Sequence, residues 1–330
     1  MKKLLNRLFE HDKLSRDEAR EVLIKIADKE YNDSQVAAFL TVFLMRSVSK
    51  NELMGFRDAL LDLCLKVDLG GLESIDLCGT GGDGKNTFNI STLSSFVVAG
   101  AGYKVTKHGN YGVSSVCGSS NVLEALGYDF TNDISKLKRQ LDKSNIAFFH
   151  APLFHPAMAS VGPIRKQLGV KTFFNMLGPI VNPVRPTHQI SGVFNLKLLR
   201  LYHYILQEEN VSYKVLHALD GYDEVSLTGD FKVGSNIGEQ VFSPEDFGLK
   251  LVKPEDIYGG ETIEESVSLF RAIISGQGTA SQNAVIEANA GLAIHCLNPH
   301  KSIQQCIEEA RESLKTGQAK KALSTLINLS

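Results

Sequence analysis

A glycine-rich segment around residue 80 is the part of the sequence best suited to bind an anion. Residues 76–92 read Asp-Leu-Cys-Gly-Thr-Gly-Gly-Asp-Gly-Lys-Asn-Thr-Phe-Asn-Ile-Ser-Thr, with four glycines between a hydrophobic run and a helical pattern. Glycines let the backbone approach a phosphate closely and point N–H groups at it, and a helix N-terminus adds partial positive charge. The segment has neither the Gly-Lys-Ser/Thr end of a Walker loop nor the G-x-G-x-x-G spacing of a dinucleotide site. It predicts an anion site of another kind, with a tight turn capped by Asn89 as the structural alternative.

Two adjacent carboxylates, Asp223 and Glu224, could hold a divalent cation. They follow the hydrophobic run 214–219, which predicts a strand, so we expect them just beyond a strand's end. Mg²⁺ prefers oxygen ligands and usually keeps several waters, so two carboxylates suit it. An isolated Asp-Glu pair is more often a solvated turn, and the residues alone leave both interpretations open.

Lys107 and Arg165 are two cationic side chains that could meet anionic groups. Lys107 follows a predicted strand, at the end where open α/β sheets bind ligands, and its ammonium is a point charge for phosphate. Arg165 offers a planar fork that matches a carboxylate. The structural alternatives are an ordinary exposed lysine and an arginine on a helix surface.

The elements that must position these residues change in character near residue 70. Residues 1–68 are predicted to be helical, because segments 15–18 and 49–52 both fit the Ser-x-x-Glu capping box and a hydrophobic stripe with helical spacing lies between them. Beyond Gly71, short hydrophobic runs alternate with glycine-rich turns and helical patterns. Strands are predicted at 74–78, 103–106, 146–149, 189–193, 214–219 and near 224–227, and helices at 92–100, 120–126, 196–209, 264–274, 282–296 and 303–314.

This alternation indicates an α/β fold with a helical N-terminal domain and a mainly parallel central sheet. The expected domains are a small helical domain at 1–70 and a large α/β domain at 71–330.

Composition excludes several classes of protein. The 330 residues are 43% hydrophobic and carry a formal net charge of −2, so no overall basic field is available for nucleic acid or an anionic membrane. No window approaches ~20 uninterrupted apolar residues, and the first residues do not resemble a secretory signal. The five cysteines form no C-x-x-C pair, which argues against a disulfide framework and a zinc site. These features predict a cytoplasmic protein.

Five segments, in this order, resemble the anthranilate phosphoribosyltransferase family. Residues 79–83 with 87–92 are similar to its signature loop, and the other segments are 107–110 (Lys-His-Gly-Asn), 155–158 (His-Pro-Ala-Met), 175–179 (Asn-Met-Leu-Gly-Pro) with 182–183, and 223–224. The resemblance covers nearly the whole chain. It implies a nucleoside phosphorylase/phosphoribosyltransferase-like fold, in which helices from about 163–190 join the small domain, and a homodimer.

The resemblance also implies an activity: transfer of the 5-phosphoribosyl group from phosphoribosyl pyrophosphate to anthranilate in tryptophan biosynthesis, with Mg²⁺ as cofactor. The implied metal ligands are Ser91, Asp223 and Glu224. The implied contacts of phosphoribosyl pyrophosphate are Gly79, Thr80, Gly82, Asp83, Thr87, Asn89, Ser91, Thr92, Lys107 and Ser119. The implied contacts of anthranilate are Gly79, His108, Asn110, His155, Arg165 and Pro179. No catalytic residue is assigned; His108 is the candidate for a general base, with a structural histidine as the alternative.

One segment departs from the commoner pattern of the family. Tyr111 and Gly112 stand where many members carry an arginine, and Val116 and Cys117 stand where a lysine often follows paired serines. Two cationic side chains are therefore missing beside the small-residue turn 114–120. The other motifs are intact, so we interpret the departure as subfamily variation.

Two other functions share part of this pattern. A pyrimidine nucleoside phosphorylase has the same two-domain plan, but it has no need for a metal site at Asp223 and Glu224, and segment 175–179 also argues against it. A noncatalytic relative that binds nucleic acid should have a basic surface and eroded loops, whereas this chain has a net charge of −2 and a complete 79–83 loop. We therefore expect neither a nucleic-acid partner nor a membrane partner.

Overall fold

The described residues form two compact units. A computed structural model describes residues 1–112 and 116–330, so Ser114 and Ser115 of the predicted turn 114–120 lie outside the described residues. No helix in the described part of the chain is long and apolar enough to cross a membrane. The first unit comprises Met1–Val67 and Ala151–Arg185, and the second comprises Asp68–His150 and Pro186–Ser330.

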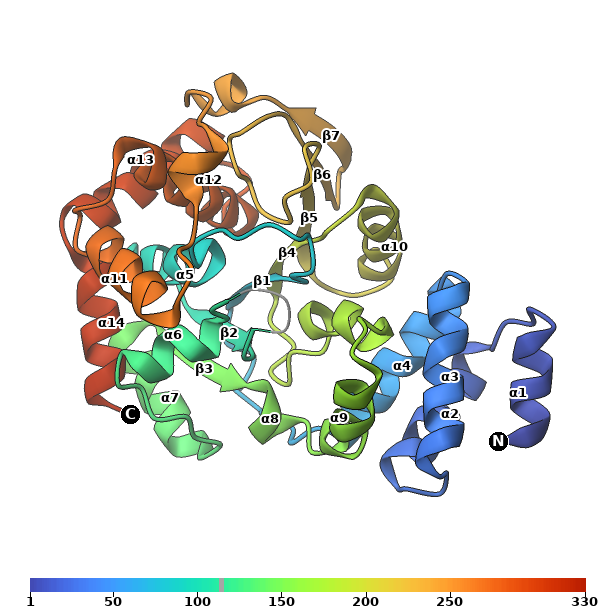
Figure 1. The fold of residues 1–330 in the computed structure, drawn as a ribbon. Coiled ribbons are helices and arrows are strands. Elements are labelled where there is room, and N and C mark those ends of the chain that lie inside the picture. Colours follow the sequence, from blue (N-terminus) through green and yellow to red (C-terminus); the bar gives the residue numbers. More distant parts are fainter. Residues whose placement is uncertain (113–115) are drawn as a thin grey trace. The chain divides into compact units, whose positions relative to one another are not determined.

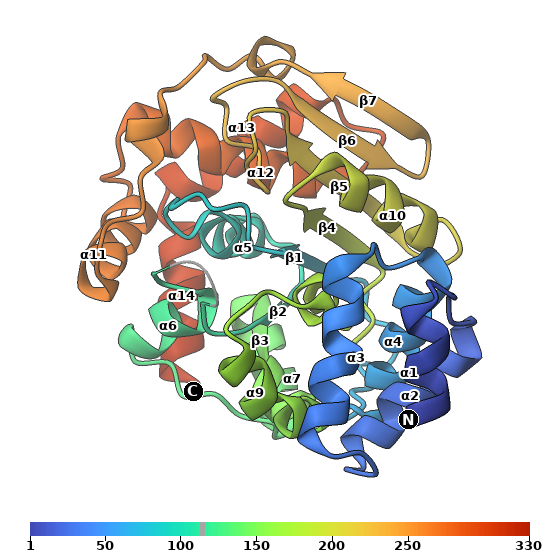
Figure 2. The same cartoon turned by 45° about the vertical axis from the view of Figure 1, so that its right-hand side comes forward.

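The first unit is helical. Its elements are α1 (Lys2–Phe9), α2 (Arg16–Ala27), α3 (Asp33–Met45), α4 (Lys50–Leu63), α8 (Ala151–Phe154), α9 (Ala157–Leu168) and the 3-10 helices η1 (Phe173–Met176) and η2 (Gly178–Ile180). The predicted helical character of 1–68 is confirmed, and the capping boxes that begin at Ser15 and Ser49 both form. α2 packs along α4 (Figure 2). Phe173 of η1 stacks on Phe56 of α4, with ring centroids 4.2 Å apart.

Glu52, the acidic partner in the capping box at the start of α4, has a wider role than capping. Its side chain is fully buried, and its two oxygens accept hydrogen bonds from the backbone N–H groups of Ser49 (2.9 Å) and Leu14 (3.0 Å). The Arg46 guanidinium donates to both oxygens, at 2.6 and 3.0 Å. One carboxylate therefore ties the segment before α2, the end of α3 and the start of α4 together.

The second unit is built on one seven-stranded sheet within the described residues (Figure 1). The strands stand in the order β3 (Ile146–His150), β2 (Val105–Gly109), β1 (Ile75–Gly79), β4 (His188–Gly192), β5 (Ser212–Ala218), β6 (Phe231–Ser235) and β7 (Gly238–Phe242). The first five run parallel, and β6 and β7 are antiparallel additions at one edge. The predicted α/β fold with a mainly parallel sheet is confirmed.

The direction in which strands are added to the sheet reverses between β1 and β4. From β1 the chain adds β2 and β3 on one side, and it then adds β4 and β5 on the other. Loops after β1 and β4 therefore diverge, and open α/β sheets bind ligands at such a switch point. Gly79 and Gly192 are register partners at the carboxyl ends of these two strands.

Helices cover both faces of this sheet. They are α5 (Ile90–Gly100), α6 (Ser119–Ala125), α7 (Ile134–Ser144), α10 (Leu196–Leu206), α11 (Ile263–Ile274), α12 (Ala280–Leu297), α13 (Ile303–Lys315) and α14 (Gln318–Asn328), with 3-10 helices η3 (Pro244–Phe247) and η4 (Pro254–Ile257). Successive side chains of a strand point to opposite faces. On β5, Tyr213 bonds His203 of α10 (2.9 Å) and Lys214 bonds His295 of α12 (2.7 Å), so α10 and α12 lie on opposite faces.

The structure departs from the sequence prediction in a few places. The predicted strand at 224–227 is wrong, because the backbone groups of Val225 bond to a side chain and Leu227 has a φ of 59°, in the left-handed region. Three further features, α7, α14 and the hairpin of β6 and β7, are not predicted from the sequence. The outer strand of that hairpin is mostly exposed and lacks a regular alternation of hydrophobic residues.

We expect Glu52→Gln to lower the free energy of unfolding by roughly 3–5 kcal/mol, because it leaves the mostly buried Arg46 guanidinium without its charge partner. Burial acts to raise the pKa of Glu52, but the hydrogen bonds from Arg46 and from two backbone N–H groups outweigh it and hold that pKa below its usual value. The stabilisation is therefore present above the unfolded-state pKa and disappears as pH falls through the folded-state pKa. Urea denaturation followed by far-UV circular dichroism at several pH values measures both effects.

The control is Glu21→Gln, which removes an exposed pair with Lys25 in α2. It should change the free energy of unfolding little, because solvent screens such pairs. Equal losses in the two variants would contradict the role assigned to Glu52.

Candidate active site

Asp223 lies over the carboxyl ends of β1 and β4, where the sheet has its switch point. Its Oδ2 accepts a hydrogen bond of 2.7 Å from the backbone N–H of Gly81. A Cβ at Gly79 would come within 2.7 Å of that oxygen, and a Cβ at Gly192 would overlap the backbone carbonyl oxygen of Asp223. Glycine at both strand ends therefore allows this close approach.

Glu224 occupies the N-terminus of α5. Its Oε1 accepts a hydrogen bond of 2.9 Å from the backbone N–H of Ser91, in the first turn of the helix. A helix N-terminus carries partial positive charge and favours a carboxylate. The side chain of Asn89 does not cap the helix and donates instead to the carbonyl of Cys117 (2.8 Å). The alternative in which Asn89 merely caps the turn is therefore wrong.

The carboxylates in this region repel one another in a buried setting. Burial, followed by the negative charge of Asp83, raises the pKa of Asp223 to about 7. Burial, followed by the charge of Asp223, raises the pKa of Glu224 well above its usual value, although Lys107 acts in the opposite direction. Ionising both groups together is therefore unfavourable, and a nearby divalent cation would reverse that.

This set of donors fits Mg²⁺. Asp223 and Glu224 supply carboxylate oxygens, and Ser91 lines the same pocket. Mg²⁺ is commonly held by one or two carboxylates together with waters and substrate phosphates. The described residues contain no group of three or more His, Cys, Asp or Glu side chains that could hold a metal, so they do not enclose an ion with such ligands alone.

The glycine-rich loop lies across the ends of β1 and β4. Gly81 and Gly82 have φ values of 60° and 82°, in the left-handed region that favours glycine. The backbone N–H of Thr80 donates to the carbonyl of Gly192 (2.9 Å). The buried Oγ1 of Thr80 has no hydrogen-bond partner among the described residues, and a polar ligand would satisfy such a group.

The rest of the loop is held by one internal hydrogen bond and by contacts with other segments. The carboxylate of Asp83 accepts hydrogen bonds from the backbone N–H groups of Lys85 (3.0 Å) and Asp223 (3.3 Å). Thr87 forms an isolated β-bridge with Tyr258. Thr92 is buried in the first turn of α5. These bonds fix the loop's shape next to the paired carboxylates.

Lys107 and His108 are buried near the carboxyl end of β2, and each is 2% exposed. The Lys107 ammonium donates to the carbonyl of Leu77 (2.6 Å), so the alternative of an ordinary exposed lysine is wrong. The backbone N–H of His108 donates to Asp76 (3.1 Å). A buried ammonium near acidic groups supplies positive charge that solvent screens little.

Asn110 and Ser119 are adjacent in the region that follows β2. The Ser119 hydroxyl donates to the backbone carbonyl of Asn110 at 3.2 Å. Tyr111, which stands where the family often has arginine, packs edge-on against His150 with ring centroids 5.1 Å apart. Its hydroxyl donates to Glu124 (3.3 Å), so an aromatic side chain with an acidic partner replaces a cation here.

Three residues with an implied contact to anthranilate belong to the first unit: His155, Arg165 and Pro179. Burial lowers the pKa of His155 to about 4, so this histidine is neutral at pH 7. Pro179 is buried in η2. The Arg165 guanidinium lies 5.1 Å from the centre of the Phe174 ring and donates to Asn175 (3.3 Å).

Arg165 carries a half-buried positive charge, and that burial lowers its pKa. Its Nε is buried and has no hydrogen-bond partner among the described residues. A partly desolvated guanidinium with a free donor favours an anionic ligand, because the ligand would satisfy both the charge and the N–H group.

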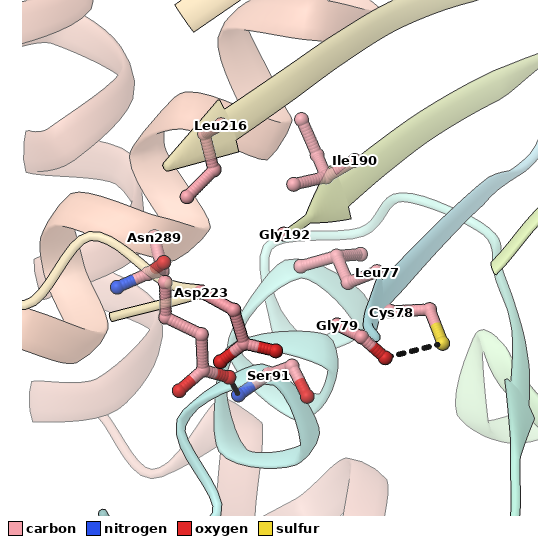
Figure 3. A pocket seen from close by; sticks show the side chains of 10 residues that line it. Leu77, Cys78, Gly79, Ser91, Ile190, Gly192, Leu216, Asp223 and Asn289 are labelled. Carbon is pink, nitrogen blue, oxygen red and sulfur yellow. Dashed lines mark hydrogen bonds between the residues drawn. The ribbon is translucent and has the colours of Figure 1, made fainter. Parts of the chain in front are cut away.

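A small pocket, partly open to solvent, lies at the switch point (Figure 3). It brings together four residues of the predicted site: Gly79, Ser91, Asp223 and Glu224. Gly192 and Asn289 also line it, and the sequence does not predict either as a site residue. Gly192 reads as part of an ordinary strand and Asn289 as part of an ordinary helix, so neither carries a local signal of function.

Two family models match the chain. The model described as "Glycosyl transferase family, a/b domain" matches residues 72–320, and "Glycosyl transferase family, helical bundle domain" matches residues 2–64. The anthranilate phosphoribosyltransferase of Flavobacterium johnsoniae is 57% identical over 330 residues, which cover 100% of both chains. That of Christiangramia forsetii is 54% identical and covers 100% of this chain and 99% of its own.

Solved structures agree with these relatives. The anthranilate phosphoribosyltransferase of Thermus thermophilus superposes with a TM-score of 0.91 at 30% identity, covering 98% of each chain. The Saccharomyces cerevisiae enzyme, solved in complex with PRPP and Mg, has a TM-score of 0.90 at 26% identity and covers 98% of this chain and 96% of its own. On these matches, this chain belongs to the anthranilate phosphoribosyltransferase family.

Proposed function

We propose that this chain transfers the 5-phosphoribosyl group from phosphoribosyl pyrophosphate to anthranilate, giving N-(5-phosphoribosyl)anthranilate and pyrophosphate in tryptophan biosynthesis. One observation carries the proposal beyond family membership. The paired carboxylates of Asp223 and Glu224 bond to backbone N–H groups of the glycine-rich loop and of α5, at the switch point of the sheet. Such an arrangement suits a substrate that carries phosphates and a magnesium ion.

Each part of the site has a physical task in this reaction. Ser91, Asp223 and Glu224 would hold Mg²⁺, and the bound ion would neutralise charge on the pyrophosphate leaving group. The 79–83 loop and the start of α5 would hold the phosphate groups through backbone N–H groups and hydroxyls. Lys107 adds positive charge from a position that is shielded from solvent.

The reaction is a substitution at the ribose C1. The C1–O bond to pyrophosphate breaks and its electron pair leaves with the pyrophosphate, while the anthranilate nitrogen forms a bond to C1 and then loses a proton. By analogy with other glycosidic cleavages, the transition state has oxocarbenium character. The aromatic amine is uncharged at neutral pH, so positioning does most of the remaining work. His108 stays the candidate if a general base takes the proton.

The two rival functions have no specific observation in their favour. A pyrimidine nucleoside phosphorylase does not need the paired carboxylates of Asp223 and Glu224, and the full-length relatives are named anthranilate phosphoribosyltransferase. A cytoplasmic location and a homodimer belong to the proposal by family resemblance. The primary test mixes the protein with anthranilate, phosphoribosyl pyrophosphate and Mg²⁺ and follows the decay of anthranilate fluorescence; unchanged fluorescence would refute the proposed function.

The double variant Asp223→Asn, Glu224→Gln should lose activity at limiting Mg²⁺. Loss of an outer-shell partner of a metal typically costs roughly 10–100-fold, and loss of two direct ligands should cost more. The double variant should also melt at a higher temperature without ligands at pH 8, because it removes two buried carboxylates whose raised pKa values make ionisation unfavourable. Asp220→Asn, in the same loop and bonded to Thr228, is the control. Full activity of the double variant at limiting Mg²⁺ would rule out the metal assignment.

Gly81→Val should weaken binding of phosphoribosyl pyrophosphate, measured by calorimetry, because its side chain lies where the substrate must approach the backbone. A side chain at this positive φ also strains the chain by roughly 1–2 kcal/mol. Gly248→Val is a matched control, since Gly248 has a φ of 69° and, like Gly81, has open space where a Cβ would lie. Both variants should lose stability, and only Gly81→Val should lose affinity. Normal binding by Gly81→Val would mean that the loop merely shapes a turn.

Arg165→Ala should raise the Michaelis constant for anthranilate on the order of ten- to a hundredfold, since it removes a charge-assisted hydrogen bond to the carboxylate. The Michaelis constant for phosphoribosyl pyrophosphate should stay nearly unchanged. Arg165→Lys should recover only part of the loss, because lysine lacks the planar fork. Lys166→Ala, an exposed neighbour on α9, is the control. If Arg165→Ala impairs only the use of phosphoribosyl pyrophosphate, Arg165 binds that substrate and its assignment to anthranilate is wrong.

A further inference from the structure

Asn289 is a buried amide in the middle of α12 that bonds to the loop bearing the paired carboxylates. Its side-chain oxygen accepts a hydrogen bond from the backbone N–H of Val225 (3.1 Å), and its side-chain nitrogen donates to the carbonyl of the same residue (2.8 Å). The same nitrogen also donates to the carbonyl of Val285, one turn earlier in the helix (2.8 Å). The carboxamide thus bonds both backbone groups of Val225, as a neighbouring strand would.

The position of this amide matters because Val225 directly follows Glu224. The side chains of Asp223 and Glu224 each accept one backbone hydrogen bond, from Gly81 and from Ser91, and Asn289 bonds the main chain of the next residue. Figure 3 shows Asn289 and Asp223 lining the same pocket. The hydrogen bonds from Asn289 supply two fixed backbone contacts immediately beyond Glu224.

The helix that carries Asn289 is a rigid support. α12 packs against α5 and α13, and Val285, Ile286, Ala290 and Ile294 are fully buried. The loop itself has no regular secondary structure at 224–229. A precise metal site needs its ligands held by such a supporting shell.

We propose that Asn289 is a positioning residue for the metal and pyrophosphate subsite: by bonding both backbone groups of Val225, it holds the carboxylate of Glu224 at the N-terminus of α5. The inference rests on the proposed function. It differs from a purely structural role, because a structural amide would affect stability without changing how substrate affinity depends on Mg²⁺.

The test compares Asn289→Leu, which keeps the size of the side chain and removes its hydrogen bonds, with the wild type. Calorimetry measures the affinity for phosphoribosyl pyrophosphate at limiting and at saturating Mg²⁺. We expect Asn289→Leu to lose roughly 10–100-fold in affinity at limiting Mg²⁺ and to recover most of it at saturating Mg²⁺. In steady-state kinetics, the Michaelis constant for Mg²⁺ should rise while that for anthranilate stays unchanged. Asn289→Ser, which leaves room for water to restore some bonds, should show a smaller change in the same direction.

The matched control is Gln140→Leu. Gln140 is also a fully buried amide of the second unit, bonded to Tyr128 (3.0 Å) and to the carbonyl of Leu329 (3.4 Å), and it does not line the pocket. This variant should melt at a lower temperature and keep the wild-type dependence on Mg²⁺. If Asn289→Leu, or Asn289→Ser where the leucine variant does not fold, has the wild-type dependence on Mg²⁺, the inference is overturned. A wild type that neither consumes anthranilate nor binds phosphoribosyl pyrophosphate would instead overturn the proposed function.

Discussion

The organisation of the second unit depends on two neighbouring carboxylates, which are held near the carboxyl ends of β1 and β4 and largely shielded from water. Asp223 is buried and Glu224 half-buried beside it, both with raised pKa values, an arrangement that is unfavourable without compensation. The surrounding backbone compensates in part, because Gly81 donates to Asp223 and Ser91 donates to Glu224. The glycine-rich loop, the N-terminus of α5 and the end of β5 therefore converge on these two side chains. The site keeps an excess of negative charge, which a divalent cation carried by a substrate would neutralise.

The first unit contains a partly buried positive charge. Arg165 is a half-buried cation beside Phe174 and Asn175, and its Nε has no partner among the described residues. These two neighbours are an aromatic ring and a neutral amide, so neither neutralises the charge of the guanidinium. In the proposed function, the negative charge of Asp223 and Glu224 suits the reactant that arrives with a divalent cation, and the positive charge of Arg165 suits the reactant that carries a single carboxylate.

Local patterns account for most of what the sequence predicted correctly. The capping boxes at Ser15 and Ser49, the five parallel strands and the place of the glycine-rich segment between a strand and a helix each follow from residues close together in the chain. The wrong strand, unlike the local elements that were not predicted, concerns a contact between distant segments. The predicted strand at 224–227 fails because its hydrogen-bonding partner is Asn289, which is 64 residues from Val225. The links from Glu52 to Leu14 and from Arg165 to Phe174 likewise need the packed structure, because a carboxylate or guanidinium does not reveal its neighbours in sequence.

Gly79 and Gly192, the two glycines next to Asp223, differ in the substitutions that they can tolerate during evolution. A methyl group at Gly79 would meet the side chain of Asp223, so a second substitution that shortens that side chain could make room for it, at the expense of the carboxylate. A methyl group at Gly192 would meet the main chain of Asp223, which every amino acid shares. No single replacement elsewhere restores that space. Gly192 should therefore be the more invariant of the pair among functioning descendants, and Gly79 should vary only in lineages that have also given up the acidic group.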